Sequence, residues 1–303
     1  MISCSVRYIS VTEAANKWGL SGRIVRRYCS EGRIDGALMI GKTWNIPENA
    51  SPPERKKAKR PSENAVLNAL REEKDGKIKG RIYHKVQVNM TYNSNRIEGS
   101  KLSEDQTRWI FETNTIGIEN EAVNIDDIIE TKNHFRCIDL VIENAERPLT
   151  EGMIKELHFT LKTGTSDSER SWFRTGAYKL IPNEVGGEET CPPAQVGYRM
   201  NELIEGYNSK RTKTVEDIIG FHQRFERIHP FQDGNGRVGR LIMFKECLAN
   251  DIVPFIIDER HRLYYYRGLK EWENEKGFLL DTCLSAQDEF RKWLRYFEIM
   301  EQD

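Results

Sequence analysis

The sequence predicts a large all-α domain that carries one β-hairpin, preceded by a small domain of two short helices and a second hairpin. Three observations lead to this fold class. From about residue 63 onward, apolar residues recur at helical spacing almost without interruption. The segment 176–193 is the exception, because glycine and proline punctuate a short apolar run there. Residues 1–50 show two helix signals followed by an alternating apolar stretch.

The composition is that of a water-soluble chain with room for one large and one small domain. The sequence has 303 residues, of which 31% are charged, and its mean hydropathy is -0.66. No apolar run reaches the roughly 20 residues that cross a bilayer, and no basic and then apolar signal peptide begins the chain. The cysteines form no Cys-x-x-Cys pair. We therefore expect a cytoplasmic protein with reduced cysteines and no membrane partner.

Charge is distributed unevenly along the chain. Residues 1–60 carry 12 Lys and Arg against 5 Asp and Glu, a net charge of +7, while the remainder carries 34 against 42, a net charge of -8. Two parts with opposite electrostatic roles are expected. We therefore divide the chain into a domain over 1–50, a linker over 51–62 and a domain over 63–303.

The first domain begins with two helix signals. Thr12 can cap a helix that ends near Trp18, after which Gly19 makes a turn. Ser21 can cap a second helix that ends near Cys29. Farther along, apolar residues alternate on both sides of a glycine turn, which predicts a two-stranded wing. The alternating residues are Leu38, Ile40, Trp44 and Ile46 about Gly41.

This order of helix, turn, helix and wing resembles the winged helix-turn-helix of the MerR and excisionase type. The resemblance implies that the second helix enters the major groove of double-stranded DNA. Three arginines on its outer side and one lysine in the wing are then the candidate DNA-binding residues. They are Arg23, Arg26, Arg27 and Lys42. The alternative is a basic helical hairpin that docks on another protein, and nothing in the segment identifies an operator.

The linker SPPERKKAKRPS combines three prolines with a run of basic side chains, which is typical of a solvated connection. Ten helices are predicted after it. Their ranges are 64–75, 82–98, 103–113, 122–144, 150–162, 194–207, 214–228, 237–249, 261–273 and a last one from about 277.

Residues 229–240 read HPFQDGNGRVGR and join two of these helices. The helix over 214–228 ends just before His229, and the next one begins at about Gly236 or Arg237. A glycine-rich loop therefore runs into a helix N-terminus. Unpaired backbone N–H groups and the positive end of the helix dipole make such a place an anion site.

The other side chains of this segment fit phosphate chemistry. Arg237 and Arg240 fall three apart in the first turn, where cations oppose the dipole at about 0.3–1 kcal/mol each unless an anion compensates them. A polyphosphate over the helix end would supply that anion. Asp233 offers the oxygen ligand that Mg²⁺ requires, and His229 can take a proton from an attacking hydroxyl. The alternative, a core histidine, a turn aspartate and two surface arginines, gives no reason for all four to meet here.

The segment resembles the signature of the Fic family, His-Pro-Phe-x-(Asp or Glu)-Gly-Asn-Gly-Arg-x-x-Arg, at every fixed position. The resemblance covers an all-α core from about 64 to 303 and leaves out the N-terminal domain. Proteins of this family typically transfer AMP from ATP to a Ser, Thr or Tyr hydroxyl of a protein. The resemblance therefore implies ATP as substrate, Mg²⁺ as cofactor, and protein acceptors that include this chain itself.

The resemblance also implies a role for each residue of the catalytic loop, 229–240. His229 would deprotonate the acceptor hydroxyl, and Asp233 would hold the metal on the α- and β-phosphates. The anion hole and the phosphate contacts would come from Gly234, Asn235, Gly236, Arg237 and, on the γ-phosphate, Arg240.

The hairpin over 176–193 resembles the flap of the family, which aligns a target segment by adding it as a strand. Lys179, Leu180 and Ile181 are then the candidate docking residues. An ordinary surface hairpin is the alternative.

The stretch RLYYYRGL, 262–269, resembles a family element in which tyrosines flank the nucleotide. Tyr265 and Tyr266 are therefore candidate nucleotide-binding residues. Aromatic residues of a helical core would give the same pattern.

An inhibitory motif is implied near the end of the helix over about 82–99. SNRIEG, 94–99, matches the family pattern (Ser or Thr)-x-x-x-Glu-(Gly or Asn), with Ser94 and Glu98 on one helical face. A Glu98 carboxylate that reached Arg240 would take the place of the γ-phosphate and leave ATP in an unproductive pose. A plain acidic residue at a helix end is the alternative. In some relatives the same glutamate positions a water that removes AMP, so removal of AMP is an open second activity.

The sequence therefore predicts a self-inhibited AMP transferase joined to a DNA-binding domain. Two alternatives stay open, namely a DNA-binding transcriptional regulator that only senses ATP, and transfer of another nucleotide or of phosphate. His229 and Asp233 together argue against a pure sensor, because sensing requires no base. No motif identifies the target protein, the signal that releases Glu98 or the oligomeric state, a homo-oligomer included.

Overall fold

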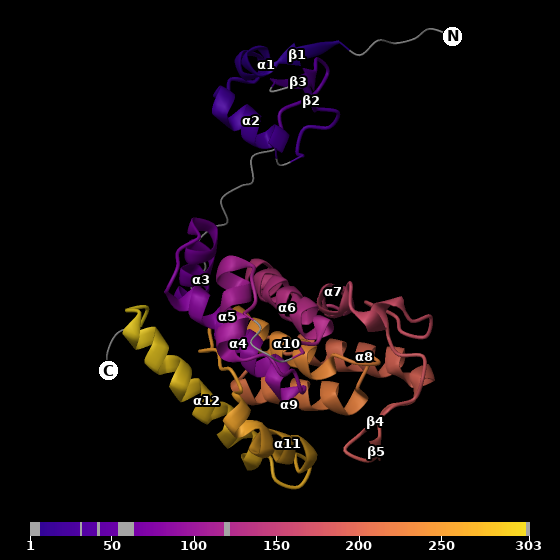
Figure 1. The fold of residues 1–303 in the computed structure, drawn as a ribbon. Coiled ribbons are helices and arrows are strands. Elements are labelled where there is room, and N and C mark those ends of the chain that lie inside the picture. Colours follow the sequence, from indigo (N-terminus) through magenta and orange to yellow (C-terminus); the bar gives the residue numbers. More distant parts are fainter. Residues whose placement is uncertain (1–6, 31, 41–42, 54–63, 118–121, 301–303) are drawn as a thin grey trace. The chain divides into compact units, whose positions relative to one another are not determined.

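The computed structural model describes residues 7–30, 32–40, 43–53, 64–117 and 122–300. Backbone contacts divide the chain into two compact units, Met1–Arg60 and Pro61–Asp303 (Figure 1). The first unit contains a small sheet and two helices, and the regular structure in the described part of the second is helical apart from one short hairpin.

The small unit is built on a three-stranded antiparallel sheet in the order β1-β3-β2. The strands are β1 (Tyr8–Ser10), β2 (Leu38–Ile40) and β3 (Thr43–Pro47). Helices α1 (Val11–Trp18) and α2 (Gly22–Ser30) pack on each other, and α1 also packs on β1 and β3. The core between these elements is formed by Val11, Ala14, Ala15, Val25, Tyr28, Cys29, Ile34 and Ile46.

Two details of this unit differ from the sequence prediction. Ser10, and not Thr12, caps α1, since Ser10 Oγ accepts from the Glu13 N–H at 3.2 Å and Glu13 Oε2 accepts from the Ser10 N–H at 2.7 Å. This reciprocal capping box satisfies two backbone donors at once. Strand β1 is the second difference, because a strand of three residues is too short to show an alternation in sequence.

All ten helices predicted for the large unit are present, with ends that differ by at most about three residues. They are α3 (Ala65–Gly76), α4 (Ile82–Ile97), α5 (Glu104–Thr113), α6 (Ile125–Asn144), α7 (Glu151–Lys162), α8 (Pro193–Asn208), α9 (Val215–Ile228), α10 (Asn235–Ala249), α11 (Arg262–Lys270) and α12 (Gly277–Tyr296). Two short 3-10 helices, η1 (Ser166–Glu169) and η2 (Glu259–His261), lie in the connections.

Helix α10 lies at the centre of the large unit (Figure 1), with α4, α6, α7 and α9 packed around it. Almost every residue of α10 is buried, including its charged ones. Charged groups inside a protein need partners there, because water no longer solvates them. Lys245 Nζ, for example, donates to Glu246 Oε1 at 2.6 Å, and the Tyr207 hydroxyl donates to Glu246 Oε2 at 2.9 Å. The N-terminal arginines of α10 face the same requirement.

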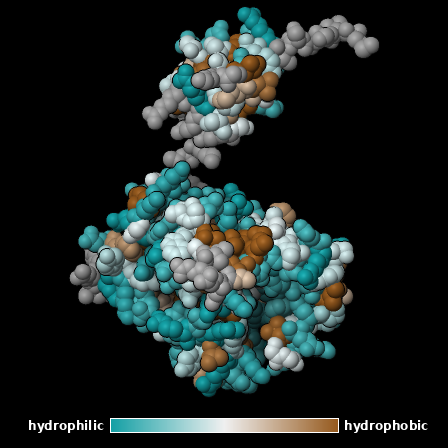
Figure 2. Space-filling model, in the orientation of Figure 1, coloured by the Kyte–Doolittle hydropathy of each residue, from teal (hydrophilic) through white to brown (hydrophobic). Residues whose placement is uncertain are grey.

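The surface of the large unit is mostly hydrophilic, as the face drawn in Figure 2 shows, with apolar residues gathered in small patches. This is the expected consequence of one continuous helical core. Within the described ranges, every helix is too short or too polar to cross a lipid bilayer.

The segment 176–193 pairs as a hairpin only at its tip. Strand β4 (Glu184–Val185) pairs with β5 (Glu188–Glu189) around Gly186 and Gly187, which have φ values of 60° and 81°. Positive φ angles at both turn positions explain the two glycines. The paired part is therefore shorter than the sequence suggested, and residues 179–181 precede it.

Candidate functional site

His229 ends α9 in a conformation that is unusual for its residue type. Its φ of 50° and ψ of 63° lie in the left-handed region, and its backbone N–H donates to the Phe225 carbonyl at 2.9 Å. Ring Nδ1 lies 3.3 Å from the Glu226 carbonyl oxygen. Because a carbonyl only accepts, Nδ1 carries the hydrogen and Nε2 keeps its lone pair.

The protonation state of His229 follows from its surroundings. Burial, the largest influence, lowers the pKa of His229 to about 4, so the ring is neutral at pH 7. A neutral imidazole with an unprotonated Nε2 is the state that a general base requires.

The loop after His229 is closed by a side chain. Asn235 Oδ1 accepts from the Phe231 N–H at 2.8 Å, and Asn235 Nδ2 donates to the Phe231 carbonyl at 2.9 Å. Gly234, with φ of 81°, then turns the chain into α10. The Asn235 side chain therefore shapes the loop.

His158 on α7 contacts the catalytic loop, although the sequence suggested only a packing role for this residue. Its ring stacks on Phe231, with centroids 3.9 Å apart and planes 2° from parallel. Nδ1 accepts from the Gly176 N–H at 2.9 Å, so Nε2 carries the hydrogen that is donated to the Asp233 carbonyl at 3.1 Å. One histidine thus connects the loop to the start of the hairpin segment.

Arg237 and Asp233 belong to a cluster with Glu130, Lys162 and Asp167, the last with its Oδ2 3.3 Å from Lys162 Nζ. Arg237 donates to Glu130 of α6, and its Nη2 lies 3.1 Å from Asp233 Oδ2. Lys162 of α7 completes the cluster, with Nζ 2.7 Å from Asp233 Oδ2 and 2.5 Å from Glu130 Oε1. Burial opposes the charge of Asp233, but Arg237 and Lys162 outweigh it and hold the pKa of that carboxyl well below its usual range. Asp233 is therefore ionised, as a metal ligand must be.

The surroundings of Asp233 suit a metal ion that is bound together with phosphate groups. Its side chain is 46% exposed, in contrast to the buried Lys162. In the part of the chain that the structure describes, no group of three or more His, Cys, Asp or Glu side chains could hold a metal alone. Mg²⁺ commonly takes one or two carboxylates and completes its shell with phosphate oxygens and water. Asp233 fits the role of the single carboxylate in such a shell.

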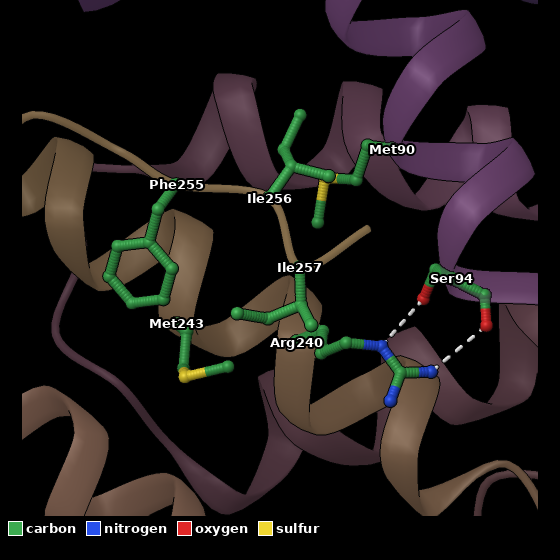
Figure 3. Close-up of a pocket in the computed structure, with 7 residues that line it drawn as sticks. All are labelled: Met90, Ser94, Arg240, Met243, Phe255, Ile256 and Ile257. Atoms are coloured by element: carbon green, nitrogen blue, oxygen red, sulfur yellow. Dashed lines mark hydrogen bonds between the residues drawn. The ribbon is translucent and has the colours of Figure 1, made fainter. Parts of the chain in front are cut away.

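Arg240 is buried and is bound by the end of α4. Its Nε donates to Ser94 Oγ at 2.9 Å, and its Nη2 donates to the Ser94 carbonyl at 3.0 Å and to Glu98 Oε1 at 2.7 Å. Figure 3 shows the Arg240 guanidinium held against Ser94. The small pocket beside it, about 10 Å³, has room for roughly one water. The other side chains that line this pocket are Met90, Met243, Phe255, Ile256 and Ile257.

The Glu98 carboxylate lies directly against the first turn of α10. A Cβ atom added to Gly236 would lie 2.2 Å from Glu98 Oε1, so a larger residue there would have to displace the Glu98 carboxylate. The N-terminus of α10, which the sequence predicted as an anion site, thus faces an anion that belongs to the protein itself.

The spacing of Arg237 and Arg240 suggested one shared counterion, but the two arginines of α10 have different partners. The helix begins at Asn235 and not at Gly236 or Arg237, so Arg240 lies in the second turn. Arg237 is compensated by Glu130 and Asp233, and Arg240 by Glu98. Glu130 and Glu98 come from distant helices, which no local spacing could reveal, whereas Asp233 lies four residues before Arg237.

Tyr265 and Tyr266 have different surroundings. The Tyr265 ring is buried, and its hydroxyl lies 2.6 Å from His222 Nε2 and 3.5 Å from Arg240 Nη1. Arg240 can only donate, so the Tyr265 hydroxyl hydrogen points to His222. The Tyr266 hydroxyl donates to the Ile97 carbonyl at 3.3 Å, next to Glu98, and its ring is partly exposed. Tyr265 and His222 therefore support Arg240 from the core side.

Replacing Tyr265 by phenylalanine is expected to lower the free energy of unfolding by about 1–3 kcal/mol, because His222 Nε2 would be left buried without its partner. Urea unfolding followed by circular dichroism measures this. The matched control is Tyr266→Phe, which removes one hydrogen bond at a partly exposed position and should cost less. Equal effects of the two changes would contradict a supporting role for the Tyr265 hydroxyl.

The three candidate docking residues also differ in exposure. Leu180 and Ile181 are exposed, by 49% and 43%. Lys179 is buried, and its backbone N–H already donates to the Pro230 carbonyl at 2.9 Å. That N–H cannot pair with an added strand while this bond exists, so in this state Leu180 and Ile181 are the exposed members of the candidate docking set.

Among the candidate DNA-binding residues, Arg26 is exposed on α2. The side chains of Arg23 and Arg27, and the whole of Lys42, lie outside the described residues.

Part of the chain matches a known protein family and curated proteins of that family. The sequence profile of the Fic/DOC family matches residues 148–247. The chain is 29% identical over 183 residues to the protein adenylyltransferase Fic of Aedes aegypti, which covers 59% of this chain and 36% of that protein. It is 27% identical over 187 residues to the protein adenylyltransferase fic-1 of Caenorhabditis elegans, with 59% and 35% covered. The chain thus spans about a third of the length of these curated relatives.

Solved structures show the same fold. A Fic-domain-containing signaling protein from Bacteroides thetaiotaomicron superimposes with a TM-score of 0.62 at 23% identity, over 78% of this chain and 99% of that one. At this identity the likeness concerns the fold alone. Residues 148–247 therefore match the Fic/DOC family, and they lie in a largely helical chain with the fold of a solved Fic-domain protein.

Proposed function

We propose that the large unit is a protein adenylyltransferase that moves AMP from ATP to a hydroxyl group of a protein and is restrained by Glu98. One observation carries the proposal. The unprotonated Nε2 of His229 lies in the loop that leads into the N-terminus of α10, and there a carboxylate of the chain itself is paired with the buried Arg240. The adenylyltransferases among the relatives support AMP as the transferred group.

In the proposed reaction, the triphosphate lies over the start of α10. Backbone N–H groups from Gly234 to Gly236 and the helix dipole stabilise its negative charge. Arg237 adds a fixed cation on one side, and Arg240 binds the γ-phosphate once Glu98 has left it. Mg²⁺, when bound at Asp233, supplies positive charge that stabilises the departing pyrophosphate.

His229 performs the proton transfer. Its Nε2 takes the proton of the acceptor hydroxyl while that oxygen forms a bond to the α-phosphorus of ATP. The bond from the α-phosphorus to the bridging oxygen breaks, and pyrophosphate leaves with the electron pair. The neutral state of His229 at pH 7 makes it ready to accept that proton.

Glu98 restrains this reaction by occupying Arg240. Its carboxylate lies 2.7 Å from Arg240 Nη2, where a γ-phosphate oxygen would bind. Ser94 of the same helix holds the guanidinium in place through two hydrogen bonds. The triphosphate must therefore bind with its γ-phosphate elsewhere until Glu98 is displaced.

The experiment that tests the proposal is intact mass spectrometry of the Glu98→Gly chain after incubation with ATP and Mg²⁺. A gain of one AMP unit on the chain itself or on an added protein supports the proposal. Label from γ-labelled ATP, without label from α-labelled ATP, would show phosphate transfer and overturn it. Binding of ATP without any covalent label would instead support a nucleotide sensor.

We also propose that the small unit binds double-stranded DNA through α2. Support comes from the net charge of +7 over residues 1–60 and from the α1, Gly19 turn and α2 order, with Arg26 exposed on the second helix. Changing Arg23, Arg26 and Arg27 together to alanine is expected to reduce affinity for DNA at least tenfold at low salt and to weaken its dependence on salt. Fluorescence anisotropy with labelled duplex DNA measures both. Unchanged affinity would favour docking on a protein.

A further inference from the structure

Lys179 contacts the backbone on both sides of the catalytic histidine. Its backbone N–H donates to the Pro230 carbonyl at 2.9 Å, and its Nζ lies 3.5 Å from the Ile228 carbonyl oxygen. Ile228 and Pro230 are the two neighbours of His229 in the chain. Lys179 is only 3% exposed, so these contacts are shielded from water.

The backbone at His229, between the two contacts of Lys179, is strained. His229 is a non-glycine residue with φ of 50°, a left-handed conformation that is strained for any residue with a Cβ atom. The surrounding contacts must therefore hold the turn. Nearby, Asn183 Nδ2 donates to the Phe231 carbonyl at 3.2 Å, and the Ile181 N–H lies 3.4 Å from Gln232 Oε1. The segment that leads into the hairpin thus lines the catalytic loop from Ile228 to Gln232.

Lys179 also connects both arms of the hairpin. Its Nζ donates to Asn183 Oδ1 at 2.7 Å, before β4, and to Thr190 Oγ1 at 2.5 Å, after β5. Thr190 Oγ1 in turn donates to the Asn183 carbonyl at 2.9 Å. A displacement of either arm therefore reaches the ammonium group that contacts the turn of His229.

We propose that Lys179 is a positioning residue for His229, and that it couples the hairpin over 176–193 to the catalytic base. The proposal rests on the proposed function, since it assigns His229 as the base of the transfer. A target segment that docks along the exposed Leu180 and Ile181 would contact the residues next to Lys179 in the chain. Docking of the acceptor and alignment of the base would then be linked through one side chain.

The positive charge of Lys179 also favours the neutral form of His229. Burial is the largest influence and lowers the pKa of His229, and the hydrogen bond to the Glu226 carbonyl raises it. The Lys179 ammonium then lowers this pKa further, while Glu98 and Asp233 raise it. Loss of Lys179 removes a nearby cation and opens the turn to water, and both changes make protonation of His229 easier. The pKa of His229 is therefore expected to rise when Lys179 is replaced by a neutral residue.

The first test measures His229 directly and requires no reaction. Imidazole signals of the otherwise unchanged chain are titrated by NMR, with His229 identified as the signal that is lost in His229→Gln. We expect the midpoint near pH 4 in the parent and at a higher pH in Lys179→Met. Lys179→Arg should restore a low midpoint. A midpoint that is unchanged in Lys179→Met would overturn the proposal.

The second test separates positioning from docking in the Glu98→Gly background. Lys179→Met should reduce kcat for AMP transfer on the order of 100-fold, because a small displacement of a base is costly, and should leave the Kd for ATP nearly unchanged. Ile181→Ala, at an exposed neighbour, should instead raise the KM for the protein target at similar kcat. Lys155→Met is the matched lysine control, since Lys155 packs on the Tyr178 ring at 4.3 Å and bonds to Glu151, and no contact described for its ammonium reaches the catalytic loop.

The outcomes distinguish the two proposals. An active Glu98→Gly chain whose Lys179→Met variant keeps kcat and loses only target affinity would overturn the positioning role and return Lys179 to target docking. An inactive Glu98→Gly chain would contradict the proposed function alone, because the NMR midpoint still decides whether Lys179 sets the state of His229. If Lys179→Met does not fold, Thr190→Val removes one acceptor of the same ammonium, and an unchanged midpoint there would also count against the proposal.

Discussion

Glu98→Gly is expected to raise the rate of AMP transfer by roughly 10- to 100-fold. The change removes a charge-assisted hydrogen bond to Arg240, a contact that contributes about 1.5–3 kcal/mol against binding of the γ-phosphate. Glycine is compatible with the end of α4, because Glu98 is the C-cap residue and not an interior helical position. Incorporation of α-labelled ATP into protein, followed over time with purified wild-type and variant chains, measures the effect.

Two further variants test whether the activation comes from loss of the Glu98 charge at Arg240. Glu98→Gln keeps the shape of the side chain without its charge, so it should activate less than glycine does. Glu112→Gln removes a different carboxylate that contacts the same helix, through His84 of α4 at 2.9 Å, and leaves Arg240 untouched. It should stay at the wild-type rate. If Glu98→Gly incorporated no more label than the wild type, the restraint assigned to Glu98 would be wrong.

His229→Ala in the Glu98→Gly background is expected to reduce AMP transfer by about 10²- to 10⁴-fold, which is the usual contribution of a positioned general base. Nucleotide affinity should change little, because the arginines and the glycines of the loop remain. Affinity is measured by isothermal titration calorimetry with ATP and Mg²⁺, and transfer by label incorporation. A loss of both in equal measure would indicate that the loop had collapsed.

His261→Ala is the matched histidine control for this experiment. His261 lies in η2, with its Nδ1 2.8 Å from Asp258 Oδ1, and it has no contact with the catalytic loop among those described. Its replacement should leave transfer near the level of the Glu98→Gly parent. Retention of transfer in His229→Ala would assign proton removal to another group.

The helices could be predicted because their signals are local. A buried helical face repeats every three or four residues, so ranges such as 214–228 are readable without any knowledge of the fold. The catalytic loop could be predicted for the same reason, since its histidine, aspartate, glycines and arginines all lie within twelve consecutive residues, 229–240. The hairpin was predicted less well, because two-residue strands leave almost no alternation to detect.

The supporting residues of the site could not be predicted. Glu130, Lys162, His158 and His222 each lie in a helix with no motif around them. Their importance comes mainly from partners far away in the chain, 32 residues for Lys162 with Glu130 and 107 for Arg237 with Glu130. Lys179 was assigned to target docking from its place in a predicted hairpin, and only the structure shows that it is buried and contacts Ile228 and Pro230.

By itself, the sequence determined that a histidine, an aspartate and a glycine-rich helix start lie together in one short loop, and that Ser94 and Glu98 share a helical face. Those features depend on bonds and turns between near neighbours. The pairing of Glu98 with Arg240, 142 residues away, was implied by the family resemblance, and the tertiary structure alone decided that Arg237 pairs with Glu130. The physical reason is that α10 is buried on nearly every side, so its cations must find carboxylates on whichever helices pack against it.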